Sequence, residues 1–335
     1  MARIPVLSRL HIDPYILAIL ATVGLAALLP ARGVGATGFG YATDLAIGLL
    51  FFLYGARLSP QTALAGARHW RLHLVVFCAT YVLFPLLGIA ARLLVPTVLS
   101  PELYVGVLFL CCLPSTVQSS IAFTSIAKGN VAAAICSASF SNLVGIVITP
   151  LLVAVLLSGH GTGLSLHSIS EIVLELLVPF AAGQLLRRWI GGFVERHGTP
   201  LKLVDRGSIL LVVYTAFSEG VVAGIWHRLS LPRLGALLVV DCVLLAVLLL
   251  ITGYASRRLG FSWPDRVTIM FCGSKKSLAS GLPMAGVLFP AGAVGLAVLP
   301  LMLFHQVQLM VCAWLAQRWS TRAAARDRLD EPAAA

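Results

Sequence analysis

The chain has 335 residues, of which 59% are hydrophobic and only 11% are charged, and its mean hydropathy is +0.95. Soluble domains carry roughly 25% charged residues, so this composition argues against a water-soluble protein and predicts a membrane protein. The net charge of +11 requires no nucleic-acid partner, because Lys and Arg gather on the cytoplasmic side of membrane proteins.

Ten apolar stretches follow one another along the chain, and each has about the 20 residues that a helix needs to cross a bilayer. They cover residues 14–30, 41–57, 72–94, 103–127, 130–157, 170–190, 203–224, 234–255, 264–289 and 293–317. The connections are short, and several are rich in glycine. The sequence therefore predicts an all-α polytopic membrane protein with ten transmembrane helices and no separate soluble domain.

The fourth stretch is interrupted near its middle by a proline and a cluster of small polar residues. The segment reads C-C-L-P-S-T-V-Q-S-S-I-A-F over residues 111–123. Its neutral oxygen and amide groups suit sodium coordination or hydrogen bonds to an anionic head group, and the alternative is ordinary contact between membrane helices. The residues concerned are Pro114, Ser115, Thr116, Gln118, Ser119 and Ser120.

The fifth stretch carries a second set of small polar residues. Ser137 and Ser141 are four positions apart and share a helix face, and Asn142 lies close to that face. Ser139 and the Thr149-Pro150 pair belong to the same stretch. This helix is therefore a candidate lining for a cavity beside the first break, and small-residue packing is the competing interpretation.

Four acids lie within the apolar stretches: Asp44, Glu175, Glu219 and Asp241. Each is a candidate cation ligand, proton carrier or lysine partner, and Glu219 is included in the candidate site because it lies between Ser218 and Gly220. In the tenth stretch, His305 and Gln306 interrupt the apolar run, and a histidine held by core hydrogen bonds is favoured over a proton relay. The seven cysteines all lie within apolar stretches and form no C-x-x-C pair, so they support neither a metal site nor a disulfide framework. We also expect no resident cofactor.

The ninth stretch contains C-G-S-K-K-S-L-A-S-G-L-P over residues 272–283. Charges inside lipid are costly, so Lys275 and Lys276 are functional candidates, together with the flanking Ser274 and Ser277. Adjacent residues on a helix do not share a face, but a break here lets both lysines face a cavity. Their candidate roles are attraction of an anion, or a fixed positive charge where a cation would otherwise bind. The alternative is that one lysine pairs with an acid or extends to the membrane surface.

The two breaks occupy corresponding positions in two halves of the chain. Non-helical backbone survives in a membrane only where protein or a water-filled cavity satisfies it, and paired interruptions indicate a transporter's binding site. The loop around Gly159 separates residues 1–158 from residues 164–320, and residues 321–335 follow as a cytoplasmic tail. Because each half holds five helices, the second is inverted, and we expect the breaks to meet near the bilayer midplane.

The distribution of basic residues predicts the orientation. With the N-terminus inside, eighteen Lys and Arg fall in inner segments and four in outer ones, while Lys275 and Lys276 lie within a stretch. We therefore expect a multi-pass protein of the cell membrane with both termini cytoplasmic. The sequence makes no prediction of the oligomeric state.

Several motifs resemble one known family. The stretch P-S-T-V-Q-S-S over 114–120, A-K-G-N-V-A over 127–132, S-F-S-N, and the G-S-K-K-S-L-A-S-G-L-P segment are similar to the bile acid:sodium symporter family, solute carrier family 10. The last segment resembles the branch of the seventh member and its bacterial relatives. The resemblance implies a core of helices 3–5 and 8–10, a panel of helices 1, 2, 6 and 7, and broken helices 4 and 9 that cross, with substrate between core and panel.

The same resemblance bears on ion coupling. Family members that use sodium place an acid and a Gln in the ninth helix, in a pattern like E-x-x-x-Q. Here those positions hold Ser274 and Leu278, with both lysines between them. The resemblance therefore implies that a lysine replaces a bound cation with a tethered one, and sodium is only a candidate coupling ion.

The favoured function is a secondary active transporter of a small organic anion that works by alternating access. One alternative is a membrane regulator that transports nothing, because the resembling branch is associated with calcium homeostasis and glycoconjugate supply. Another is a sodium-independent anion transporter or channel. An enzyme is not expected, because G-x-x-x-x-G-K-[ST], G-x-S-x-G and H-E-x-x-H motifs are absent.

Overall fold

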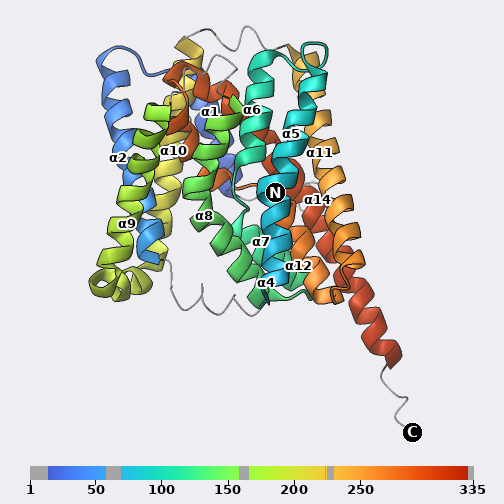
Figure 1. Ribbon diagram of the computed structural model, residues 1–335. Coiled ribbons are helices and arrows are strands. Elements are labelled where there is room, and N and C mark those ends of the chain that lie inside the picture. The colour runs from blue at the N-terminus through green and yellow to red at the C-terminus, as the bar shows by residue number, and fades with distance from the viewer. Residues whose placement is uncertain (1–13, 58–68, 158–165, 223, 225–229, 331–335) are drawn as a thin grey trace, which may run out of the picture.

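The computed structural model describes residues 14–57, 69–157, 166–222, 224 and 230–330, and every regular element in these ranges is helical (Figure 1). The elements are α1 (Pro14–Leu28), α2 (Val34–Arg57), α4 (Trp70–Cys78), η2 (Ala79–Leu83), α5 (Phe84–Ala90), η3 (Ala91–Leu94), α6 (Pro101–Cys112), α7 (Val117–Ile126), α8 (Val131–Leu157), α9 (Leu166–Arg196), α10 (Gly198–Val222), α11 (Leu231–Arg258), α12 (Trp263–Gly273), α13 (Leu278–Leu288) and α14 (Ala291–Asp330).

The prediction of an all-α polytopic membrane protein is confirmed. Within the described ranges, five helical segments are long and apolar enough to cross a membrane, and the pair α6 and α7, bent by 63°, makes a sixth. Each of the ten predicted stretches overlaps one helix or helices that directly follow one another, and ten membrane spans stay a prediction. Helix α14 continues to Asp330, so part of the expected tail is helical. The predicted boundary near Gly159 and both chain ends lie outside the described residues.

One group of helices is formed by α1, α2, α9 and α10, of which α2 and α9 lie at the left of Figure 1. The α2–α9 contact is close because glycines allow it. A Cβ on Gly55 would lie 2.0 Å from the Phe180 carbonyl oxygen, and a Cβ on Gly183 would lie 2.0 Å from that of Phe52. Small residues commonly permit such backbone approach in membranes. These two helices therefore pack as a unit.

The second group contains α4 to α8 and α11 to α14, with α14 packed along α6. Its interior is aromatic and aliphatic: Phe84 meets Phe304 edge-on, and Phe109 meets Phe289 in the same way. Helix α10 contacts α13 and α14, and α9 contacts α8, so these helices join the two groups. Both broken helices, α6–α7 and α12–α13, belong to the second group.

The third predicted stretch contains a short π-helix, η2, between α4 and α5. Here the Phe84 N–H donates to the Ala79 carbonyl, five residues back. The next donor in this register would be residue 85, which is a proline and has no N–H. The Thr80 carbonyl is therefore left without a backbone partner within the helix.

Candidate functional site

The two breaks contact each other directly. The Ser115 hydroxyl donates to the Cys272 carbonyl at 2.6 Å, and the Ser277 N–H donates to the Pro114 carbonyl at 2.9 Å. The Thr116 hydroxyl donates to the Lys276 carbonyl at 2.7 Å. The expectation that the breaks meet is confirmed, while their depth in the bilayer stays a prediction.

The Lys276 side chain crosses from the second break to the first and is fully buried. Its Nζ donates to the carbonyls of Cys111 at 2.9 Å, Leu113 at 2.5 Å and Thr80 at 2.9 Å. An ammonium has three N–H donors, so each of them has an acceptor. The Phe84 ring, with its centroid 4.0 Å from Nζ, closes one side of the group.

Gln308 of α14 holds the backbone of Lys276 from the other side. Its Oε1 accepts from the Lys276 N–H at 2.9 Å, and its Nε2 donates to the Lys276 carbonyl at 2.9 Å. Nε2 also lies 2.8 Å from His305 Nδ1, so the histidine is tied to the same arrangement. Sequence reasoning selected Gln306 and missed Gln308; the available signal was the three-residue spacing from His305, which places Gln308 on the same helix face.

Helix α8 satisfies the rest of the first break. Thr149 donates to the Cys112 carbonyl at 2.8 Å, and the Asn142 side-chain amide donates to the Ser115 carbonyl at 2.7 Å. The Ser141 hydroxyl accepts from the Ser115 N–H at 3.0 Å. The helix thus lies beside the first break, and its predicted role as the lining of a cavity stays a prediction. In this conformation these polar side chains serve the backbone.

The contacts explain how two interrupted helices persist in an apolar core. An unpaired backbone group in a membrane costs several kcal/mol, so each freed carbonyl needs a donor. The Ser115, Thr116 and Asn142 side chains supply donors to these carbonyls, and Ser141 supplies an acceptor. Direct ligand binding by these four residues stays a prediction.

Lys275 is as deeply buried as Lys276 but has different surroundings. Its Nζ has no hydrogen-bond partner among the described residues. Instead it lies 4.0 Å from the ring centroid of Phe123 and 5.2 Å from that of Phe271. The expectation that both lysines face a cavity does not hold in this conformation, because neither side chain is exposed.

Of the remaining candidate residues in the two breaks, some make hydrogen bonds within the protein and others do not. The Ser274 hydroxyl donates to the Met270 carbonyl at 2.6 Å, and the Ser277 hydroxyl caps α13 by accepting from the Ser280 N–H at 3.2 Å. The Ser119 hydroxyl is buried without a partner among the described residues, and Gln118 is exposed. Gln118 therefore presents an exposed amide, while the Ser119 hydroxyl keeps unused hydrogen-bonding capacity inside the protein.

Ser137 does not join the first break, although it shares a helix face with Ser141. Its hydroxyl lies 2.6 Å from Nδ1 of His73 on α4, one helical turn away from the Ser141 contacts. The sequence contains no indication of this pairing, because His73 belongs to another stretch. Ser137 therefore connects α8 to α4 in this conformation.

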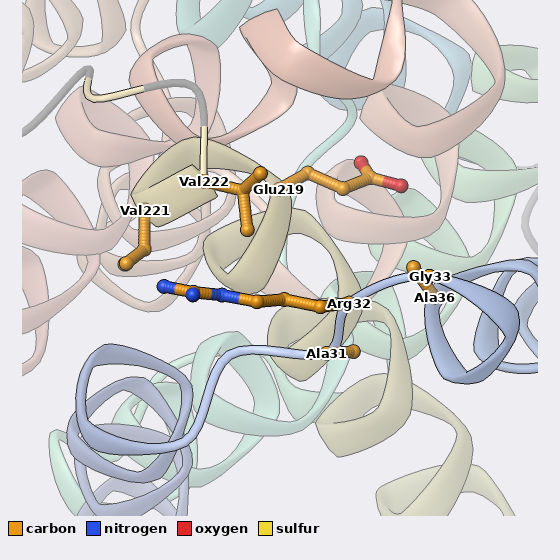
Figure 2. Close-up of a pocket in the computed structure, with 7 residues that line it drawn as sticks. All are labelled: Ala31, Arg32, Gly33, Ala36, Glu219, Val221 and Val222. Atoms are coloured by element: carbon orange, nitrogen blue, oxygen red, sulfur yellow. The ribbon is translucent and has the colours of Figure 1, made fainter.

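Glu219 lies in a separate, open pocket of about 560 Å³. The pocket lies between the α1–α2 connection and the end of α10, and Arg32 also lines it (Figure 2). In Figure 2 the Arg32 guanidinium points toward Val221, whereas the Glu219 carboxylate points the other way. Glu219 is therefore not among the described contacts of Lys275 or Lys276.

The other three acids are also absent from the described contacts of the two lysines. Asp241 is fully buried on α11, and neither carboxylate oxygen has a hydrogen-bond partner among the described residues. Asp44 is exposed on α2. Glu175 belongs to α9, but its side chain lies outside what the structure describes. Among the three of these acids whose side chains the structure describes, Asp241 is the one whose environment most demands a partner.

Known proteins resemble this chain over most of its length. A model of the SBF-like CPA transporter family matches residues 13–321, a range that includes both breaks. The chain is 60% identical to "Uncharacterized protein PA2026" of Pseudomonas aeruginosa, over 92% of this chain and 93% of that protein. It is 53% identical to "Putative symporter YfeH" of Escherichia coli, over 92% and 93% respectively. It is 29% identical to "Sodium/bile acid cotransporter 7" of Rattus norvegicus, over 91% and 92% respectively.

Proposed function

Since the chain belongs to the SBF-like CPA transporter family, we propose that it carries a small organic anion across the cell membrane by secondary active transport. The family is one of transporters rather than enzymes. The observation that carries the proposal is the contact between two interrupted helices. Hydrogen bonds from the Lys276 ammonium and the Ser115 hydroxyl join them. Paired discontinuous helices of this kind form the substrate and ion sites of many transporters.

The proposed architecture has ten spans in two inverted repeats, residues 1–158 and 164–320. This proposal is supported by the positions of the two breaks, which fall in the fourth and the ninth of the ten predicted stretches. In this proposal α1, α2, α9 and α10 form the panel, and the remaining helices form the core. Rocking of the panel against the core would then expose the region of the breaks to each side in turn.

Two basic side chains support an anionic substrate. Lys275 carries a buried amine that no described residue hydrogen-bonds, and an arriving anion would supply the missing partner. Arg32 lines the open pocket at the end of the bundle, where it suits the capture of an anion. Sodium is a candidate coupling ion because one relative is named as a sodium cotransporter.

Ligand binding and transport are tested in sequence. Purified protein is screened for an increase in unfolding temperature with organic anions, with and without sodium, because ligands that bind the folded state raise it. The best ligand is then offered to proteoliposomes with and without a sodium gradient. Saturable uptake with counterflow is expected. Binding without flux would indicate a regulator, and flux without saturation or counterflow would indicate a channel.

The proposed orientation is tested at the C-terminus. An Ala333→Cys variant in intact cells should resist a membrane-impermeant thiol reagent, because the distribution of basic residues predicts that both termini are inside. The unmodified chain, with its seven cysteines, gives the background labelling. Ready labelling above that background would overturn the orientation.

A further inference from the structure

The three carbonyls around Lys276 Nζ come from positions where the helix supplies no backbone N–H donor for them. Thr80 lacks a donor because the next residue in the π-helical register is Pro85. Cys111 and Leu113 stand at the end of α6, where the last carbonyls of a helix have no partner within it. The fold therefore presents three oxygens to one point.

The distances around that point match those at which oxygen atoms bind a cation. Nζ lies 2.5–2.9 Å from the three oxygens, and the Phe84 ring presents its face from 4.0 Å. Rings of backbone carbonyls replace the hydration shell of small monovalent cations, and an aromatic face also attracts positive charge. The site is thus built for a monovalent cation.

The hydrogen bonds also indicate the charge of the group. A neutral amine has two N–H donors, whereas Lys276 makes three bonds to carbonyl oxygens, which are acceptors only. Three such bonds require the ammonium form. Extension of this charge to the membrane surface does not occur, since the side chain is fully buried. No carboxylate of a described residue pairs with it.

We propose that Lys276 is a tethered cation that permanently fills a monovalent-cation site formed by the carbonyls of Thr80, Cys111 and Leu113. The site takes sodium, potassium or ammonium only when the lysine side chain is removed. One consequence for the transport cycle rests on the proposed function. The contact between the two breaks forms without a free ion at this position. Any coupling ion binds elsewhere.

The test removes the Lys276 side chain and supplies a free cation in solution. Purified Lys276→Ala protein is unfolded by heat in chloride salts of sodium, potassium, ammonium or N-methylglucamine at equal ionic strength. A small cation at about ten times its Kd should raise the unfolding temperature of this variant by about 2–5 °C over N-methylglucamine. The wild-type protein should show no such difference, because its site is filled.

Two variants complete the design. Lys276→Met keeps most of the stem and should remain insensitive to the cation, because its side chain blocks the space. Lys275→Ala removes the neighbouring charge, leaves the three carbonyls occupied and should also be insensitive. An equal cation response in wild type, or in Lys275→Ala, would overturn the proposal.

Failure of Lys276→Ala to fold is also informative. Extraction of monodisperse protein in sodium, potassium or ammonium but not in N-methylglucamine supports the proposal. If the variant aggregates in every salt, or folds with no preference among them, the carbonyls do not form a cation site. Because these measurements need no transported anion, they are independent of whether the proposed transport function is correct.

Discussion

Lys275 and Lys276 are neighbours in the sequence and equally enclosed by protein, but their amine groups have opposite surroundings. Lys276 Nζ has a full set of three carbonyl acceptors, whereas Lys275 Nζ has only two aromatic faces nearby and no hydrogen bond among the described residues. Burial alone therefore does not tell what a lysine in a membrane does. The Lys276 ammonium holds the two breaks together, whereas the Lys275 amine keeps unused hydrogen-bonding capacity.

The geometry of the break creates this difference. The residues of the second break, 274–277, are not helical, so the two side chains are not constrained to the approximately 100° separation of adjacent helical positions. One turns toward the end of α6 and the other toward Phe123 on α7. The comparison predicts different effects for the same substitution at the two positions and at their supporting residues.

The largest effect on stability is expected for Lys276→Met. The change leaves three buried carbonyls without a donor, and each unsatisfied group costs about 1–3 kcal/mol. We expect the free energy of unfolding to fall by at least about 3 kcal/mol, measured by chemical unfolding in detergent. A loss no greater than that of Lys275→Met would contradict the structural role of this lysine.

Gln308→Leu should have the next largest effect. The variant leaves the Lys276 N–H and carbonyl without the amide that binds both, although Thr116 still donates to the carbonyl. A destabilisation of about 2–3 kcal/mol follows from two weakened buried groups. Gln306→Leu is the matched control, because no described contact uses its side chain in this way. Equal unfolding curves for the two variants would show that the amide is dispensable.

A smaller effect is expected for Ser115→Ala. Its hydroxyl donates to the Cys272 carbonyl, so the loss of this one bond should cost about 1–2 kcal/mol. Ser119→Ala is the control on the same segment, since the Ser119 hydroxyl has no partner among the described residues. Thermal unfolding of the two variants side by side should separate them by several degrees. If Ser119→Ala is the more damaging change, the assignment of contacts at the first break is wrong.

The smallest effect on stability is expected for Lys275→Met. Loss of the contacts with Phe123 and Phe271 is offset by removal of a buried charge without hydrogen bonds, so the net change should stay within about 1 kcal/mol. Affinity for the transported anion should nevertheless fall about tenfold or more, measured by ligand titration. Unchanged affinity together with unchanged uptake would make Lys275 a passive residue.

The positions of both breaks could be predicted from the sequence, because proline, glycine and small polar residues are costly inside an apolar helix. The contact between the breaks also followed from their matching positions in the two halves. The distinct roles of Lys275 and Lys276 could not be predicted. They depend on side-chain directions at non-helical backbone, for which no periodicity exists.

Other misses have equally specific causes. Gln306 and Gln308 differ by two positions, which on a helix is a rotation of about 200°, so only the packing of α14 decides which of them reaches Lys276. Ser137 and Ser141 share a face, but one helical turn separates their partners. Glu219 lies in a locally polar sequence, and the structure places it in the pocket with Arg32.

Calorimetric titration of the purified proteins shows whether Lys276 fills a cation site. Sodium, potassium and ammonium chloride are titrated into wild type and Lys276→Ala at constant ionic strength. We expect Lys276→Ala to bind one more monovalent cation per chain than wild type does. Identical cation stoichiometry in the two proteins, with both folded, would contradict it.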